Sequence, residues 1–228
     1  MTDIYKNLNL RFEHTALKPE TTAKDIEKLC QEALRWRFYG VVVNPVWVRQ
    51  CQESLRNSKI KIISVCGFPL GANRTDVKTM EAVKAVNDGA NEIDMVANIG
   101  WLVADAFTKA EKEIAEIRKS LPYNIILKVI IEANKLNKEQ QENATRSGIN
   151  GGAQFVKTGT GFFGRVTLEQ VKTLYHTTQG QIEVKAAGGI KELKQARGLI
   201  EAGASRLGCS SSTQIMEQLK AEDNDKNK

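Results

Sequence analysis

The sequence predicts the α/β class, as a single closed barrel of eight parallel strands and eight helices. Three observations lead to this prediction. The chain has 228 residues, 41% of them hydrophobic, and one α/β barrel commonly occupies up to about 250 residues. Short β-branched runs alternate regularly with polar segments of helical period, which indicates βα units around a parallel sheet. Eight such units fit this length, so we expect a (β/α)8 TIM barrel.

The expected strands are short apolar runs at residues 10–17, 40–44, 61–68, 91–98, 124–132, 153–158, 181–187 and 205–208. Helical patterns fill residues 22–36, 74–89, 105–121, 137–151, 167–178 and 190–203, and a last helix is expected after Ser210. N-cap residues are expected at Thr22, Asn137 and Thr167, and glycines that end helices at Gly89, Gly152 and Gly203. We therefore expect one TIM-barrel domain over residues 1–219. The polar tail at 220–228, "KAEDNDKNK", has no apolar period and is expected to be disordered.

Composition indicates which ligands, compartment and metal sites to expect. The formal charge is +6, but basic and acidic residues are interspersed, which favours a solvated surface and a small anionic substrate over nucleic acid. The four cysteines form no C-x-x-C pair and no signal segment opens the chain, so we expect a reduced, cytoplasmic protein. No apolar run reaches the roughly 18 residues of a membrane helix. His14 and His176 lie far apart, so no metal site is expected.

The active site of such a barrel lies at the carboxyl ends of its strands. Polar residues near these ends are His14, Thr15, Asn44, Asp94, Lys128, Glu132, Lys157 and Lys185. Lysine is rarely buried without a partner, so Lys157 and Lys185 at neighbouring strand ends need an explanation.

Schiff-base chemistry gives one explanation. A lysine amine attacks a carbonyl only when neutral, and a second ammonium group together with burial lowers its pKa. Asp94 is expected near the exit of its strand, where a carboxylate can transfer protons. The alternative is a structural layer of ion pairs inside the barrel, because alternation places Glu183 on the face of Lys185 and Glu132 on the face of Lys128.

Glycine and serine follow the last two expected strands. Gly188 and Gly189 come after the seventh strand, and Gly208, Ser210 and Ser211 come at the end of the eighth, before the final helix. Glycines permit close backbone approach and helix N-termini bind anions, so the pair of loops predicts a phosphorylated substrate.

The segment "VKTGTGFFG" at 156–164 permits a second interpretation. Gly159, Gly161 and Gly164 match the G-x-G-x-x-G pattern of dinucleotide-binding turns, and Glu183 lies about 20 residues further on. However, the pattern falls on the sixth unit, whereas a dinucleotide-binding fold carries it at its first strand. The lysine of this segment is therefore the more informative residue.

Seven motifs in this order resemble those of deoxyribose-phosphate aldolase and extend over nearly the whole chain. They are "EHTALKPE" (13–20), "GFPLGA" (67–72), "NEIDMV" (91–96), "LKVIIE" (127–132), "FVKTGTGF" (155–162), "KAAGGI" (185–190) and "RLGCSS" (206–211). The resemblance implies Lys157 as the Schiff-base nucleophile, a choice over Lys185 that the residues alone leave open. It implies that Lys185 tunes this amine and that Asp94 transfers protons.

The same resemblance implies a phosphate site and a reaction. The residues implied to hold the phosphate are Gly161, Gly188, Gly189, Gly208, Ser210 and Ser211. The implied reaction is the reversible cleavage of 2-deoxy-D-ribose 5-phosphate to D-glyceraldehyde 3-phosphate and acetaldehyde, with no metal or other cofactor, in a homodimer. A related aldolase acting on another phosphorylated sugar and a basic binding module are the alternatives.

The chain departs from the family pattern at several positions. Gly159 stands where serine is usual, Cys209 where threonine or alanine is frequent, and Val42 where cysteine is frequent. The first motif reads "EHTAL", where aspartate and leucine are more usual. Each departure leaves the implied catalytic groups in place, so activity is expected.

Overall fold

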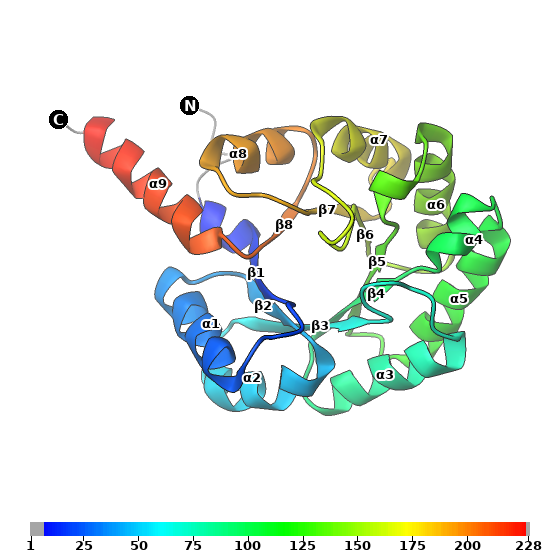
Figure 1. The fold of residues 1–228 in the computed structure, drawn as a ribbon, viewed down its shortest axis with the longest axis horizontal. Coiled ribbons are helices and arrows are strands. Elements are labelled where there is room, and N and C mark those ends of the chain that lie inside the picture. Colours follow the sequence, from blue (N-terminus) through cyan, green and yellow to red (C-terminus); the bar gives the residue numbers. More distant parts are fainter. Residues whose placement is uncertain (1–6, 227–228) are drawn as a thin grey trace.

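The computed structural model describes residues 7–226 and forms a closed barrel of eight parallel strands, arranged in chain order (Figure 1). The strands are β1 (Phe12–Ala16), β2 (Gly40–Val43), β3 (Lys61–Cys66), β4 (Glu92–Val96), β5 (Ile126–Ile130), β6 (Phe155–Lys157), β7 (Glu183–Ala187) and β8 (Arg206–Cys209). The last strand closes the ring on the first, with Phe12 opposite Leu207 and His14 opposite Cys209. The predicted TIM barrel and its eight strands are confirmed.

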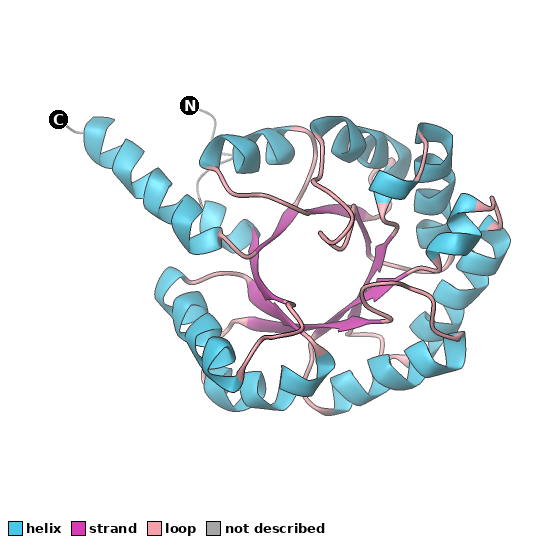
Figure 2. Cartoon of the chain, viewed as in Figure 1, coloured by secondary structure: helices cyan, strands magenta, loops and turns pink. Residues whose placement is uncertain are grey.

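Helices surround the strands on the outside (Figure 2). They are α1 (Ala23–Trp36), α2 (Val48–Leu55), α3 (Thr75–Asn87), α4 (Ile99–Val103), α5 (Phe107–Ser120), α6 (Lys138–Asn150), α7 (Leu168–Thr178), α8 (Leu193–Glu201) and α9 (Ser212–Lys226). The short α4 is an addition within the segment that joins β4 to α5.

The N-cap residues and the helix-ending glycines expected from the sequence are found at the helix boundaries. Capping boxes, in which the N-cap side chain and the third helical residue bond to each other's backbone amides, begin α1, α6 and α7 at Thr22, Asn137 and Thr167. Left-handed backbone angles follow α3, α6 and α8 at Gly89, Gly152 and Gly203.

Alternation along the strands divides the apolar residues into two clusters. The larger cluster fills the space between the sheet and the helices and includes Ile93 and Met95 of β4. A smaller cluster comprises Leu17, Val42, Ile63 and Val65, with Phe68 packed against it. Ile63 and Val65 alternate with the outward-facing Ile62 of the larger cluster, so the smaller cluster lies inside the barrel beside β1–β3. Charged side chains occupy much of the remaining interior.

The C-terminal segment corrects one expectation, because α9 continues to Lys226 through most of the expected disordered tail (Figure 1). Lys220 Nζ lies 4.4 Å from the centre of the Trp36 ring on α1. Glu222 forms an ion pair with Arg197 of α8, with 2.8 Å between nitrogen and oxygen. These contacts, together with helix-favouring Lys, Ala and Glu, explain why a segment without apolar period is helical. Residues 227–228 lie outside the described residues.

Across residues 7–226, no helix has both the length and the apolar character needed to cross a membrane.

Candidate active site

Lys157, Lys185 and Asp94 meet at one point inside the barrel. Lys157 ends β6 and pairs in register with Lys185 of the neighbouring β7, whereas Asp94 comes from β4. Asp94 Oδ2 accepts hydrogen bonds from Lys157 Nζ at 2.8 Å and from Lys185 Nζ at 2.5 Å. One carboxylate oxygen therefore bridges the two amines that the sequence places at adjacent strand ends.

Thr158 holds the two lysine-bearing strands together beyond this pair. Its hydroxyl donates to the carbonyl of Ala187 at 3.0 Å and accepts the amide of the same residue at 3.0 Å. The threonine of the V-K-T segment thus links the end of β6 to the end of β7 by hydrogen bonds. These bonds hold the backbone of the adjacent Lys157 in place.

The three residues belong to a larger charged network that fills the barrel interior. Lys128 Nζ lies 2.9 Å from Asp94 Oδ1 and 2.5 Å from Glu92 Oε2. Glu13 of β1 forms an ion pair with Lys185 and lies 3.5 Å from Lys128 Nζ. At the far side, Arg206 Nε lies 4.0 Å from Glu13 Oε1 and its guanidinium stacks 3.7 Å above the Tyr39 ring.

The structural layer of ion pairs proposed from the sequence therefore exists, but its carboxylates are different ones. Glu183 is exposed. Glu132 is buried and accepts hydrogen bonds from the amide and hydroxyl of Thr160 at 2.9 and 2.6 Å. The expectation that Glu183 and Glu132 neutralise the lysines is wrong. Glu183 is exposed at the start of β7, and Glu132 lies beyond the end of β5, where its backbone is left-handed (φ +51°) and strand alternation no longer applies.

Sequence reasoning missed Glu13 as a member of the network. Alternation along β1 places Glu13 on the same face as Thr15, which lines the pocket described below. That pattern could have identified Glu13, but its partner Lys185 lies 172 residues away. Only closure of the barrel between β8 and β1 brings them together.

The network contains three carboxylates, Glu13, Glu92 and Asp94, in contact with four cationic side chains. Burial would raise the pKa of Asp94, but the ammonium groups of Lys128, Lys157 and Lys185 hold it well below its usual range. Asp94 is therefore ionised at neutral pH.

The pKa of Lys157 is lowered. Burial is the main cause, the positive charge of Lys185 acts in the same direction, Asp94 opposes both, and the pKa of Lys157 drops to about 8. For Lys128, burial would lower the pKa, but Asp94, Glu13 and Glu92 raise it. The amine at the end of β6 thus loses its proton far more readily than an ordinary lysine.

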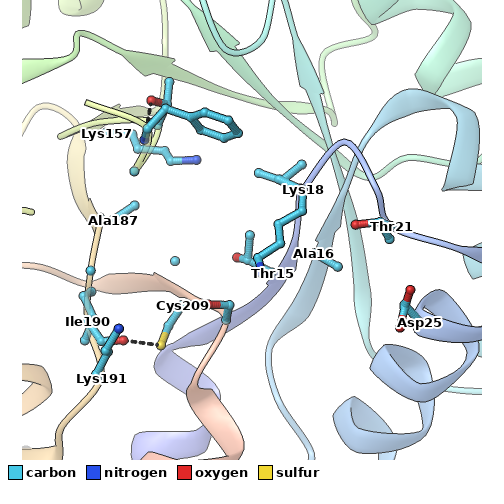
Figure 3. A pocket seen from close by; sticks show the side chains of 18 of the residues that line it. Thr15, Ala16, Lys18, Thr21, Asp25, Lys157, Ala187, Ile190, Lys191 and Cys209 are labelled. Carbon is cyan, nitrogen blue, oxygen red and sulfur yellow. Dashed lines mark hydrogen bonds between the residues drawn. The ribbon is translucent and has the colours of Figure 1, made fainter. Parts of the chain in front are cut away.

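Lys157 opens into a pocket of about 480 Å³ at the carboxyl ends of the strands (Figure 3). Five of the six residues expected to hold phosphate line it, namely Gly161, Gly188, Gly189, Gly208 and Ser210. Ser211 is not among the lining residues, and its amide donates to Cys209 Sγ at 3.2 Å. The lining continues through Thr15 of β1 and Lys18, which follows that strand.

Gly188 and Gly189 need to be glycine for a conformational reason. Their φ angles are +119° and +66°, a region that side chains disfavour. A Cβ at Gly188 would lie 3.0 Å from the carbonyl oxygen of Gly164, and the amide of Val166 donates to the carbonyl of Gly188 at 3.0 Å. The loop after β6 therefore packs directly on the loop after β7.

This packing also explains the glycine pattern in "GTGFFG". Gly164 has a φ of +137° and lies in the loop between β6 and α7. The closed barrel places that loop at the sixth unit, so the dinucleotide interpretation fails. Position 159 is glycine for a different, steric reason, because a Cβ there would lie 2.7 Å from Glu132 Oε1.

Two other polar residues near strand ends, His14 and Asn44, lie outside the charged network. His14 points away from the barrel interior, with Nε2 2.9 Å from Glu32 Oε2 of α1, and burial lowers its pKa. Asn44 Nδ2 donates to the carbonyl of Leu17 at 3.4 Å. Both are structural in this geometry.

Comparison with known proteins gives the family. The model of the DeoC/LacD family aldolases matches residues 8–215. The chain belongs to this aldolase family. It is therefore an enzyme of the aldehyde-lyase class, which makes and breaks carbon–carbon bonds.

Individual relatives within the DeoC/LacD family cover almost the whole chain. The deoxyribose-phosphate aldolase of Natranaerobius thermophilus is 46% identical over 92% of this chain and 96% of its own. The protein of the same name from Carboxydothermus hydrogenoformans is 45% identical over 91% and 92%.

Solved structures agree. The aldolase QR15 matches with a TM-score of 0.90 and 38% identity over 95% of this chain and 97% of its own. The deoxyribose phosphate aldolase from Aeropyrum pernix, described as a tetramer, matches with a TM-score of 0.88 and 30% identity over 93% and 91%.

Proposed function

We propose that this protein reversibly cleaves 2-deoxy-D-ribose 5-phosphate to D-glyceraldehyde 3-phosphate and acetaldehyde through a Schiff base on Lys157. The observation that carries the proposal is a buried amine with a pKa of about 8 that shares one oxygen of Asp94 with Lys185. The amine faces a pocket lined by glycine backbone. The names of the relatives support the substrate.

The reaction begins when the neutral amine of Lys157 attacks C1 of the open-chain sugar. The resulting carbinolamine loses its hydroxyl group as water and becomes an iminium ion. The proton for that water comes from the cluster of Lys185 and Asp94, whose atoms lie within hydrogen-bond distance of the Lys157 nitrogen or of each other.

Cleavage follows when a base removes the proton of the C3 hydroxyl. The electron pair of the C2–C3 bond then moves into the iminium group, so that C3 becomes the aldehyde carbon of glyceraldehyde 3-phosphate and C1–C2 remains on Lys157 as an enamine. We assign this proton transfer to Asp94, acting with Lys185 either directly or through one water molecule. Protonation of the enamine at C2 and hydrolysis release acetaldehyde and restore the neutral amine.

The phosphate group is assigned to the opposite end of the pocket. Gly161, Gly188, Gly189, Gly208 and Ser210 line the pocket, and α9 begins two residues after Ser210. Glycine lets the phosphate approach the backbone closely, and the first amides of a helix have no acceptor within the helix. Ser211 is assigned to the same loop as a flanking residue.

The covalent link to Lys157 supplies the electron sink that this cleavage needs, so we propose a reaction without a metal or other cofactor. We propose a cytoplasmic location, which suits the four buried free thiols. We also propose that the protein acts as a homodimer, which light scattering on a sizing column will test against the monomer and the tetramer.

The substrate proposal is tested by measuring turnover of three compounds at equal concentration. These are 2-deoxyribose 5-phosphate, unphosphorylated 2-deoxyribose and a ketose bisphosphate. We expect release of acetaldehyde from the first at a kcat/KM far above that of the second, and no cleavage of the third. Preference for the ketose bisphosphate would indicate an aldolase that acts on another phosphorylated sugar.

A further inference from the structure

The Cys209 thiol connects the two loops that line the phosphate end of the pocket. Cys209 ends β8, and its Sγ donates to the carbonyl of Ile190 at 3.0 Å in the loop after β7 (Figure 3). The same sulfur accepts the amide of Ser211 at 3.2 Å in the loop before α9. One side chain therefore makes a hydrogen bond to the backbone of each loop.

The side chain is held in this place by its surroundings. Cys209 has 3% of its surface exposed, and its carbonyl accepts the hydroxyl of Ser212 at 2.9 Å. Burial raises the pKa of the thiol, so it keeps the proton that it donates to Ile190. The thiol is consequently suited to hydrogen bonding and poorly suited to nucleophilic or redox chemistry.

The two bonds determine which backbone groups remain for a ligand. The Ser211 amide is occupied by the sulfur, whereas Ser210 lines the pocket. The bond to Ile190 fixes the segment that directly follows Gly188 and Gly189, both in the left-handed region. The relative position of the two sets of donors therefore depends on Cys209.

We propose that Cys209 is a positioning residue that sets the separation of the two phosphate-binding loops and thereby the affinity for the phosphate group of the substrate. The proposal rests on the proposed function, because it assigns the phosphate to this end of the pocket. It predicts that the thiol affects recognition of phosphate and leaves the chemistry at Lys157 unchanged.

The test compares three variants with the wild-type protein. Cys209→Val fills the space of the thiol without its hydrogen bonds, and Cys209→Ser retains a donor and an acceptor on a shorter side chain. Cys51→Ala is the matched control, since Cys51 is a fully buried thiol on α2, away from the loops. Thermal melting confirms that each variant is folded before measurement.

Two readouts separate positioning from a general structural effect. Calorimetric titration with inorganic phosphate measures anion affinity directly, and steady-state kinetics measure KM and kcat for 2-deoxyribose 5-phosphate and for 2-deoxyribose. For Cys209→Val we expect about fivefold weaker phosphate binding and about fivefold higher KM for the phosphorylated sugar, equivalent to about 1 kcal/mol. We expect kcat/KM for the unphosphorylated sugar to stay within twofold, a partial recovery in Cys209→Ser, and wild-type values in Cys51→Ala.

Unchanged phosphate affinity in Cys209→Val would overturn the proposal, as would an equal loss of kcat/KM for both sugars. Absence of measurable phosphate binding to the wild-type protein would overturn it as well. If the wild-type protein fails to cleave 2-deoxyribose 5-phosphate but the variant still loses phosphate affinity, the substrate assignment fails and the positioning role stands.

Discussion

Replacing Lys185 by leucine removes one of the two ammonium groups that share Asp94 Oδ2. The charge of Lys185 lowers the pKa of Lys157, and Asp94 raises it. Without Lys185, the carboxylate of Asp94 acts on Lys157 with no competing cation on the same oxygen. The pKa of Lys157 therefore moves upward in the variant, and the neutral amine becomes scarcer at neutral pH.

The size of this pKa shift follows from the distance between the two lysine nitrogens. The two nitrogens lie 2.8 and 2.5 Å from the same oxygen, so they are at most 5.3 Å apart, the sum of those distances. Two unit charges at this separation repel by about 3 kcal/mol at an effective dielectric constant of about 20. One pH unit corresponds to about 1.4 kcal/mol, so the pKa of Lys157 should rise by about 2, from about 8 to about 10.

The assay is the pH dependence of kcat/KM for release of acetaldehyde from 2-deoxyribose 5-phosphate, because kcat/KM reports the ionisation of the free enzyme. The wild-type rate should rise with pH, with a midpoint near 8, since only the neutral amine attacks. In Lys185→Leu the midpoint should move to about pH 10. At pH 7 the neutral fraction falls from about one tenth to about one thousandth, which lowers the rate about a hundredfold from ionisation alone.

Lys185→Arg is the control, because it keeps the positive charge while altering the shape of the donor. Its midpoint should remain near the wild-type value even if kcat falls. An unchanged midpoint in Lys185→Leu, in protein shown by thermal melting to be folded, would refute the reasoning and leave burial as the sole cause of the lowered pKa.

Three further predictions concern other parts of the site. Asp94→Asn should move the midpoint below about 8, since the carboxylate raises the pKa of Lys157, and should reduce kcat by about 10²–10⁴; a kcat within tenfold of wild type contradicts the proton-transfer role. Glu13→Gln should lower the free energy of unfolding in urea by about 3–5 kcal/mol, because it removes a carboxylate that pairs with Lys185 and lies near Lys128 and so leaves buried positive charge uncompensated; a change below about 1 kcal/mol argues against the network. Gly189→Ala, at a φ of +66°, should raise KM for the phosphorylated sugar up to about tenfold, whereas Gly203→Ala should destabilise the fold and leave KM unchanged.

Much of the barrel follows from local sequence patterns. The alternation within "NEIDMV" places Asp94 inside the barrel, and the capping residues of three helices are recognisable because their hydrogen bonds reach only three residues along the chain. Such features depend on neighbours in sequence. The candidates Lys157, Lys185 and Asp94 could be selected because strand ends converge in any such barrel.

Features that depend on distant partners could not be predicted in the same way. The contact of Glu13 with Lys185 requires closure between the first and last strands. The helical course of α9 beyond residue 219 depends on packing against Trp36, which the composition of the tail does not reveal. The bond from Cys209 to the carbonyl of Ile190 likewise depends on β7 and β8 being neighbours in the barrel.

The central claim is that Lys157 forms the covalent intermediate, and reductive trapping tests it most directly. The protein is incubated with acetaldehyde and borohydride, digested, and analysed by mass spectrometry, with Lys157→Arg as the control. The account predicts an ethyl group on the peptide that carries Lys157 and none in the variant. An adduct on Lys185, or an unmodified Lys157 in active protein, would contradict it.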